Sequence, residues 1–145
     1  MRTLVLGDLH LKEGAKGHLQ AQVDCIVGII RKTECSYIIF LGDVFMHRKP
    51  TPSVLLALQK ILAACEFKHV TILRGNHDSE TKADDGVTAL TVFEKFHFNL
   101  LGGVSVITET YHDHELKRSF IPHYENEETI KEALANVPEG YLILG

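Results

Sequence analysis

The sequence predicts an α/β fold built around a parallel sheet, and three observations support this. Residues 3–7, 37–41 and 70–73 are short apolar runs that are rich in β-branched and large aliphatic side chains. Each run is too short for a helix and is apolar on both faces, which is typical of a parallel strand covered on both sides. Each run also ends abruptly in polar residues. Between the runs lie two amphipathic segments that we expect to form helices packed on this sheet.

The elements follow in order along the chain. The first helix is expected over residues 18–31, where Val23, Ile26 and Ile30 recur at helical spacing. The second is expected over residues 52–65, with Thr51 or Ser53 as its cap and with Leu56 among its core leucines. In the rest of the chain, the apolar periodicity and the turn residues predict six further elements. They are a short helix over 87–96, a strand over 104–107, a hairpin over 108–117, a strand over 118–121, a helix over 125–135 and a strand over 141–144.

Polar side chains follow each of the three apolar runs. Asp8 and His10 come after the first run, Asp43 after the second, and Asn76 and His77 after the third. In open α/β sheets, ligands bind beyond the carboxyl ends of the strands. We therefore expect these five side chains to converge on one place.

Their chemistry indicates a metal site. The set contains carboxylates, imidazoles and an amide but no thiolate, which suits two first-row divalent cations. Asp43, on the middle run, is the expected bridge between the cations. Asp8 and His10 would bind one cation, because residues i and i+2 of an extended segment lie on the same side, and Asn76 would bind the other.

Three short motifs carry a resemblance to a known family. They are Gly7-Asp8-Leu9-His10, Gly42-Asp43-Val44-Phe45 and Gly75-Asn76-His77-Asp78, each after an apolar run. In this order they resemble the calcineurin-like metallophosphoesterase superfamily, whose fold is a two-sheet sandwich flanked by helices. Within it, the first two motifs, with Pro50 downstream and Ile121-Pro122-His123-Tyr124 later, look most like SbcD-type and phage recombination nuclease subunits.

The resemblance implies an activity and roles for particular residues. It implies a two-metal-dependent phosphodiester hydrolase, a DNA exonuclease or endonuclease subunit of recombination or repair, with Asp8, His10, Asp43 and Asn76 as metal ligands. Manganese is the expected metal, with iron, zinc or magnesium as alternatives. Asp43 and His77 are the expected catalytic residues, His77 through a phosphate or bound-water contact. Asp78 is expected to orient His10 or His77 from behind.

The second motif departs from the resembled nucleases at Met46, where they usually carry histidine or aspartate. His47 lies one place further on and either replaces that residue or leaves the function absent. Arg48 follows it. His47 and Arg48 are the candidates for contact with the substrate phosphate, an interaction that would position a backbone without reading sequence.

Composition sets limits on this interpretation. The chain has 145 residues and a net charge of −4, which predicts one domain and argues against a free-standing nucleic-acid binder. The resemblance implies DNA as the substrate and an ATPase subunit of an SbcC-like complex as the partner, and it leaves open whether the chain also forms a homodimer. Cys25, Cys35 and Cys65 lack metal-site spacing and are expected to be buried thiols in a reducing compartment. No membrane segment or signal peptide is recognised, which predicts a cytoplasmic protein, in the host cytoplasm if phage-encoded.

Two later motifs of the resembled family are missing, a histidine directly after the glycine that follows the last strand and a G-H-x-H. We therefore expect residues 1–145 to be the N-terminal part of a longer metallophosphoesterase domain. Two alternatives to the nuclease remain at this stage. One is another metallophosphoesterase, either a phosphatase or a small-nucleotide phosphodiesterase. The other is a non-catalytic chain with a role in binding or assembly.

Overall fold

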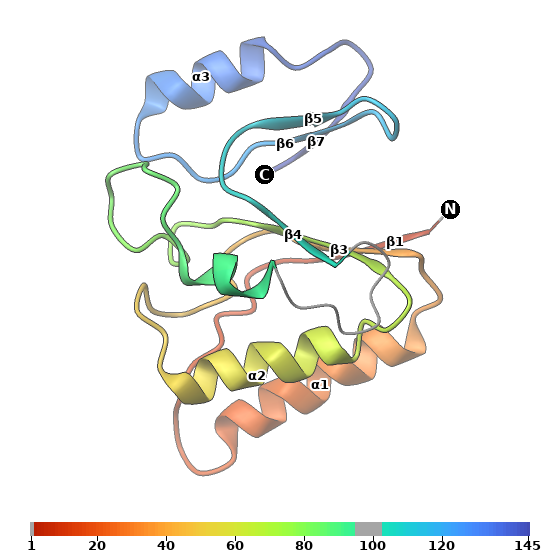
Figure 1. Ribbon diagram of the computed structural model, residues 1–145, viewed down its shortest axis with the longest axis vertical. Coiled ribbons are helices and arrows are strands. Elements are labelled where there is room, and N and C mark those ends of the chain that lie inside the picture. Colours follow the sequence, from red (N-terminus) through yellow and green to blue (C-terminus); the bar gives the residue numbers. More distant parts are fainter. Residues whose placement is uncertain (1, 95–102) are drawn as a thin grey trace.

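The computed structural model describes residues 2–94 and 103–145 of the chain. These residues form four layers, in which two stacked sheets lie between α1 and α2 on one side and α3 on the other (Figure 1). The predicted two-sheet sandwich flanked by helices is thus confirmed. In chain order the elements are β1 (Thr3–Leu6), α1 (His18–Lys32), β2 (Tyr37–Phe40), α2 (Pro52–Ala63), β3 (His69–Leu73), the 3₁₀ helix η1 (Ala89–Phe93), β4 (Val104–Ile107), β5 (Tyr111–Asp113), β6 (Arg118–Phe120), α3 (Glu127–Ala135) and β7 (Leu142–Leu144).

The first sheet contains the three apolar runs and the strand predicted over residues 104–107. Its order is β1-β2-β3-β4, and every neighbouring pair is parallel. Leu4 pairs with Ile38, and Ile38 pairs with Val70, so the apolar runs lie in register. Because all four strands run the same way, their carboxyl ends meet at one edge. This edge receives the loops that carry the predicted site.

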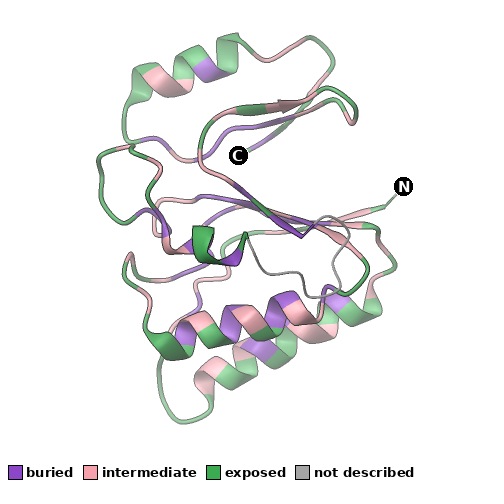
Figure 2. Cartoon of the chain, in the orientation of Figure 1, coloured by how far each residue is buried: buried purple, intermediate pink, exposed green. Residues whose placement is uncertain are grey.

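Helices α1 and α2 cover one face of this sheet. Their buried residues lie on the sides that face the sheet (Figure 2). In α1 these are Val23, Ile26 and Ile30, as the helical spacing predicts. In α2 the leucines and isoleucine toward its C-terminal end, Leu58, Ile61 and Leu62, are buried as predicted. Leu56 is 56% exposed, which corrects the expectation for that residue. Thr51 is the N-cap of α2 by position, but its hydroxyl donates to Glu13 and makes no cap hydrogen bond.

The second sheet has the order β5-β6-β7, with β5 antiparallel and β7 parallel to β6. It packs on the first sheet through one small apolar cluster, in which Phe120 and Leu144 meet Ile39 and Leu73. The α3 helix begins where the Asn126 side chain accepts a hydrogen bond from the Glu128 amide, a normal N-cap. Its Ala133 packs with Ile121 and Tyr124 in a third cluster.

Some expectations differ from the structure. The short helix expected over 87–96 is the 3₁₀ helix Ala89–Phe93 and begins later than expected, and the part of that prediction from residue 95 lies outside the described residues. Cys65 is buried, and burial raises the pKa of its thiol to about 12, but Cys25 is exposed, which corrects the expectation for that thiol. Across residues 2–94 and 103–145, no helix is long and apolar enough to span a membrane.

Candidate metal centre

Three loops meet at the carboxyl edge of the first sheet. The backbone N–H of His10 donates to the Asp43 carbonyl (2.9 Å), and that of Leu11 donates to the Val44 carbonyl (2.8 Å), so the loops after β1 and β2 are joined. The backbone N–H of His77, from the loop after β3, donates to Asp43 Oδ1 (2.9 Å). Asp43 therefore lies between the other two loops, as its place on the middle run predicts.

Two glycines allow the loops after β2 and β3 to approach so closely. A Cβ on Gly42 would lie 2.8 Å from the Gly75 Cα, and a Cβ on Gly75 would overlap the Asp43 backbone nitrogen and carboxylate. Gly42 also has φ +81°, a conformation that favours glycine. The glycines of the second and third motifs are thus required by the contact that brings Asp43 beside His77.

Three residues of the site have left-handed backbone conformations. Asp8, His10 and Asp43 have φ values of 53°, 46° and 47°. Non-glycine residues seldom adopt such angles, and those that do are concentrated at functional sites. Because of these angles the segment from Asp8 to His10 is not extended, contrary to expectation. The rule that residues i and i+2 lie on the same side therefore does not apply to Asp8 and His10.

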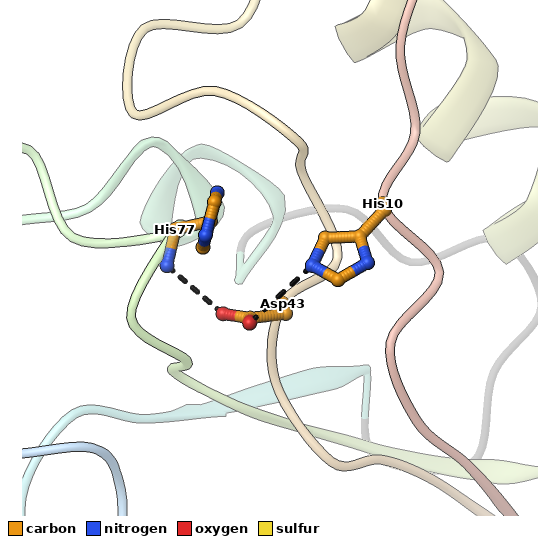
Figure 3. Close-up of side chains that lie close together, drawn as sticks. All are labelled: His10, Asp43 and His77. Atoms are coloured by element: carbon orange, nitrogen blue, oxygen red, sulfur yellow. Dashed lines mark hydrogen bonds and ion pairs between the residues drawn. The ribbon is translucent and has the colours of Figure 1, made fainter.

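In the described part of the chain, His10, Asp43 and His77 form one group of three side chains that could hold a metal ion. Each offers one ligand atom, and these atoms lie within 4.8 Å of one another (Figure 3). His10 Nε2 lies 3.4 Å from Asp43 Oδ2, and the two imidazole rings are 5.3 Å apart at their centroids. One carboxylate between two imidazoles is a donor set that divalent first-row metals accept.

The His77 ring is held in one tautomer. Its Nδ1 lies 2.6 Å from the Met46 carbonyl oxygen. A carbonyl can only accept, so Nδ1 carries the proton and Nε2 of the neutral ring keeps a free lone pair. Metal-binding histidines are commonly fixed through such a backbone contact to their other nitrogen. Met46, the position where the motif departs from the resembled nucleases, thus contributes through its backbone.

Asp78 supports the site through the backbone. Its fully buried carboxylate accepts hydrogen bonds from the amides of Val44 (3.2 Å), Phe45 (2.9 Å) and Gly75 (2.9 Å). These contacts clamp the second and third loops together, whereas the expectation was that Asp78 would orient His10 or His77 directly. Burial raises the pKa of Asp78 above its usual value, the three amides partly offset this, and the charge of Asp43 raises it further.

Asp8 and Asn76 line a hollow beside the triad. Its volume is about 500 Å³, and Asp43 also lines it. Ile121 and His123, from the segment after β6, form part of its wall. The structure therefore brings all five predicted residues to one edge of the sheet, with His10, Asp43 and His77 closest together.

The two candidates for a phosphate contact lie in different surroundings. His47 is exposed and lines a separate hollow of about 140 Å³ beside Glu13 and Thr51. Arg48 instead turns toward the third loop, where its guanidinium donates to Asn76 Oδ1 (2.7 Å).

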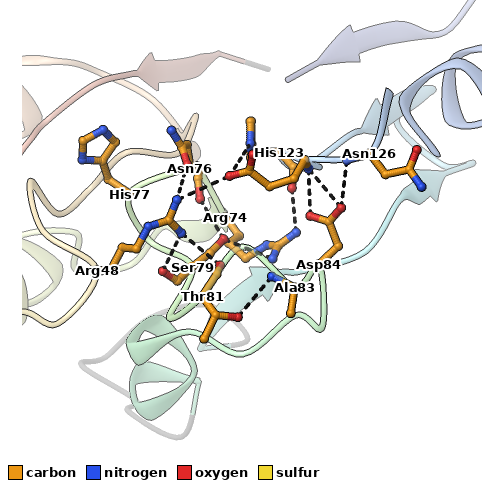
Figure 4. Close-up of polar contacts among 12 residues, drawn as sticks. Arg48, Arg74, Asn76, His77, Ser79, Thr81, Ala83, Asp84, His123 and Asn126 are labelled. Atoms are coloured by element: carbon orange, nitrogen blue, oxygen red, sulfur yellow. Dashed lines mark hydrogen bonds and ion pairs between the residues drawn. The ribbon is translucent and has the colours of Figure 1, made fainter. Parts of the chain in front are cut away.

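Arg74 and Asp84 are site-supporting residues that the sequence argument did not single out (Figure 4). Arg74 is only 1% exposed and donates to the His123 carbonyl (2.6 Å) and to Ser79 Oγ (3.1 Å). Asp84 accepts from the backbone amides of Glu125 and Asn126. Arg74 directly precedes the third motif, and this position in the sequence could have indicated that it supports the site. Nothing in the sequence indicates that Asp84 reaches a segment about forty residues away.

The fold and the donor set together define a class of protein. A parallel sheet that presents histidines and carboxylates at its carboxyl edge, stacked on a second sheet, is suited to bind divalent metals at that edge. The family model for calcineurin-like phosphoesterases matches residues 1–143. The chain therefore belongs to the calcineurin-like phosphoesterase family. A search of curated proteins gives no match.

The residues present fit the divalent metals that the family implies. The triad offers two imidazole nitrogens and a carboxylate within ligand distance of one another, and Asp8 and Asn76 add oxygen donors nearby. The orientation of the His77 ring by Met46 is further support, because it leaves Nε2 unprotonated.

Proposed function

We propose that this chain carries the metal site of a two-metal phosphodiesterase that cleaves DNA. Family membership and the triad support metal-dependent phosphoester hydrolysis. The observation that carries the proposal is the meeting of His10, Asp43 and His77 at the carboxyl ends of β1, β2 and β3.

The proposed ligands are Asp8, His10, Asp43 and Asn76, with Asp43 shared between two cations. When bound, the cations would polarise the phosphoryl oxygens, activate water and neutralise the charge that develops on the phosphate. His77 keeps an unprotonated Nε2 in its neutral form, so it can accept a hydrogen bond from water or, once protonated, donate one to a phosphate oxygen. Its closeness to His10 and Asp43 also allows it to act as a ligand.

The choice of DNA depends on the motifs. The first two motifs, Pro50 and the Ile121-Pro122-His123-Tyr124 segment resemble recombination nuclease subunits. The net charge of −4 means that an anionic polymer would approach this chain only with help from bound cations or a basic partner. We therefore also propose an ATPase subunit as the partner and manganese as the metal.

The first experiment measures hydrolysis of bis-p-nitrophenyl phosphate with added Mn²⁺. Asp43→Asn is the control, because asparagine keeps the size of the side chain and tolerates the positive φ of 47° at this position. We expect Mn²⁺-dependent turnover that falls at least about a hundredfold in the variant. Equal turnover by both proteins would contradict the proposed site, and absence of turnover in both would favour the non-catalytic alternative.

A second experiment tests the substrate class. End-labelled single-stranded and duplex DNA, p-nitrophenyl phosphate and a cyclic nucleotide are compared under the same conditions. Cleavage of DNA that depends on Asp43 supports the nuclease proposal. Turnover of the monoester or the cyclic nucleotide without DNA cleavage would instead identify the phosphatase or small-nucleotide alternative.

A further inference from the structure

Arg48 lies where three segments of the site's rim meet (Figure 4). From the loop after β2, its Nη1 donates to the backbone carbonyls of Ser79 (3.1 Å) and Thr81 (3.0 Å). Its Nη2 donates to Asn76 Oδ1 (2.7 Å) and reaches Glu125 Oε1 (3.4 Å), which lies just before α3. The four N–H bonds of the two terminal nitrogens therefore all have protein acceptors.

The contact with Asn76 decides which way that amide points. An asparagine side chain can be turned over, so that its oxygen and nitrogen exchange places. A guanidinium only donates, so the atom that faces Arg48 must be the oxygen. Among the contacts of the described residues, the Asn76 side chain has no other hydrogen bond than this one. Arg48 thus fixes the amide, and Oδ1 retains a second lone pair for another partner.

Glu125 limits the electrostatic cost of this arrangement. A bare guanidinium beside a metal ligand would repel a cation, but the Glu125 carboxylate, at 3.4 Å from Nη2, offsets that charge. The backbone of Glu125 is in turn held by the Asp84 carboxylate (2.9 Å). The chain of contacts from Asp84 through Glu125 and Arg48 to Asn76 connects the start of α3 to the site.

We propose that Arg48 is a positioning residue for Asn76, which it holds with its amide oxygen oriented as a metal ligand. This inference rests on the proposed function, because it takes Asn76 as a ligand. It assigns Arg48 a different task from contact with the substrate phosphate, since only its Nε remains to donate outside the four bonds described. The positioning depends on the forked geometry of arginine, which lysine lacks.

The test compares Arg48→Ala and Arg48→Lys with the wild type, and Lys49→Ala is the matched control. Lys49 is exposed and neighbours Arg48, so its removal deletes the same charge from the same loop without touching Asn76. The first readout needs no metal: the two side-chain N–H signals of Asn76 in a proton–nitrogen NMR spectrum. The second is calorimetric titration with Mn²⁺ alone.

Both Arg48 variants should move the Asn76 signals toward those of a free asparagine and weaken one of the two Mn²⁺ equivalents by about tenfold or more. Lys49→Ala should change neither readout. If Arg48→Ala fails to fold, Arg48→Lys decides alone, because it keeps the aliphatic stem and the charge.

Unchanged Asn76 signals in Arg48→Lys would overturn the inference. So would unchanged Mn²⁺ binding in Arg48→Ala combined with a raised KM that lysine restores, since that is the pattern of a phosphate contact. Failure of the proposed function looks different: Asp43→Asn would bind Mn²⁺ as the wild type does, whereas the Asn76 signals would still report on Arg48.

Discussion

At position 75 a single methyl group would overlap Asp43. A Cβ there would meet both the backbone nitrogen and the carboxylate of Asp43, and backbone atoms cannot move aside cheaply. We expect Gly75→Ala to destabilise the fold by about 1–3 kcal/mol, as overpacking usually does. It should also weaken Mn²⁺ binding at least about tenfold, because Asp43 must shift.

The matched control for this prediction is Gly28→Ala. Gly28 lies in α1, and a Cβ there would have open space. Alanine should stabilise this helix by about 1 kcal/mol and leave Mn²⁺ binding unchanged. Urea unfolding and Mn²⁺ titration of both variants make the measurement. Normal metal binding by Gly75→Ala would show that the two loops can separate without loss of the site.

Asp78 provides a second prediction for a single residue. Three backbone amides converge on its buried carboxylate, whereas an asparagine has one accepting oxygen and would turn N–H bonds toward donors. Asp78→Asn should therefore lower the free energy of unfolding by about 3 kcal/mol, because buried donors lose their acceptor.

The control for Asp78 is Asp24→Asn, an exposed position on α1, which should change stability by less than about 0.5 kcal/mol. Chemical denaturation measures both variants. Equal stability of Asp78→Asn and the wild type would mean that relief from burying a charge balances the lost hydrogen bonds.

The sequence predicted which residues belong to the site, because each of them follows shortly after a strand. Asp8, His10, Asp43, Asn76 and His77 each follow an apolar run, and parallel strands bring such positions together. The hydrogen bonds between loops were not predictable. Asp78 reaches amides 33 and 34 residues away, which depends on backbone angles that the sequence does not display.

At the scale of elements, the loop after β3 is tied to the start of α3 by Asp84. Burial tends to raise the pKa of this carboxyl, but hydrogen bonds from the Glu125 and Asn126 amides outweigh it, so the pKa is lowered from its usual 3.8. A lowered folded pKa means that the carboxylate contributes stability above the usual value. This contribution is lost as the pH falls through the folded pKa.

Asp84→Asn should therefore be less stable than the wild type at pH 7, by about 1 kcal/mol from its weakened hydrogen bonds. The difference should shrink as the pH falls below 3.8. Thermal unfolding at several pH values measures it, with the exposed Asp85→Asn as control. A difference that stays constant from pH 7 to pH 3 would show that the carboxylate charge is not involved.

The types and order of the helices and strands were largely predictable. Which side chains of each helix are buried was less predictable. The helix starting at His18 buries the residues that its periodicity indicates. In α2 the polar residues Ser53, Gln59 and Lys60 lie at helical spacing from Leu56, so they marked its side as the outward one, although leucine by itself favours the core. The 3₁₀ helix Ala89–Phe93 begins later than predicted, and its Val92 is 54% exposed between the buried Leu90 and Phe93.

For the whole molecule, the two sheets are joined by much less apolar contact than the first sheet shares with its helices. Among the residues that the structure describes, Ile39, Leu73, Phe120 and Leu144 form the buried cluster between the sheets, whereas the cluster under α1 and α2 is several times larger. Arg118 adds a polar tie, a hydrogen bond to Thr3 Oγ1 (2.9 Å). The second sheet should therefore open before the first.

The variant Phe120→Ala tests whether the second sheet opens before the first. Truncation of a buried phenylalanine costs about 3–5 kcal/mol, and because Phe120 supplies much of the contact between the sheets, we expect the loss to be local. Hydrogen exchange followed by mass spectrometry should show reduced protection in β6 and β7 and unchanged protection in β2 and β3.

The comparison variant is Phe40→Ala, which removes the same side chain from the larger cluster. It should reduce protection in every strand, because the first sheet is the layer on which the second one rests. Equal loss throughout the chain in Phe120→Ala would instead mean that the sandwich unfolds as one unit. If the second sheet opens first, Ile121 and His123 move away and one wall of the hollow opens. The loops that carry His10, Asp43 and His77 stay in place, so Phe120→Ala should still bind Mn²⁺.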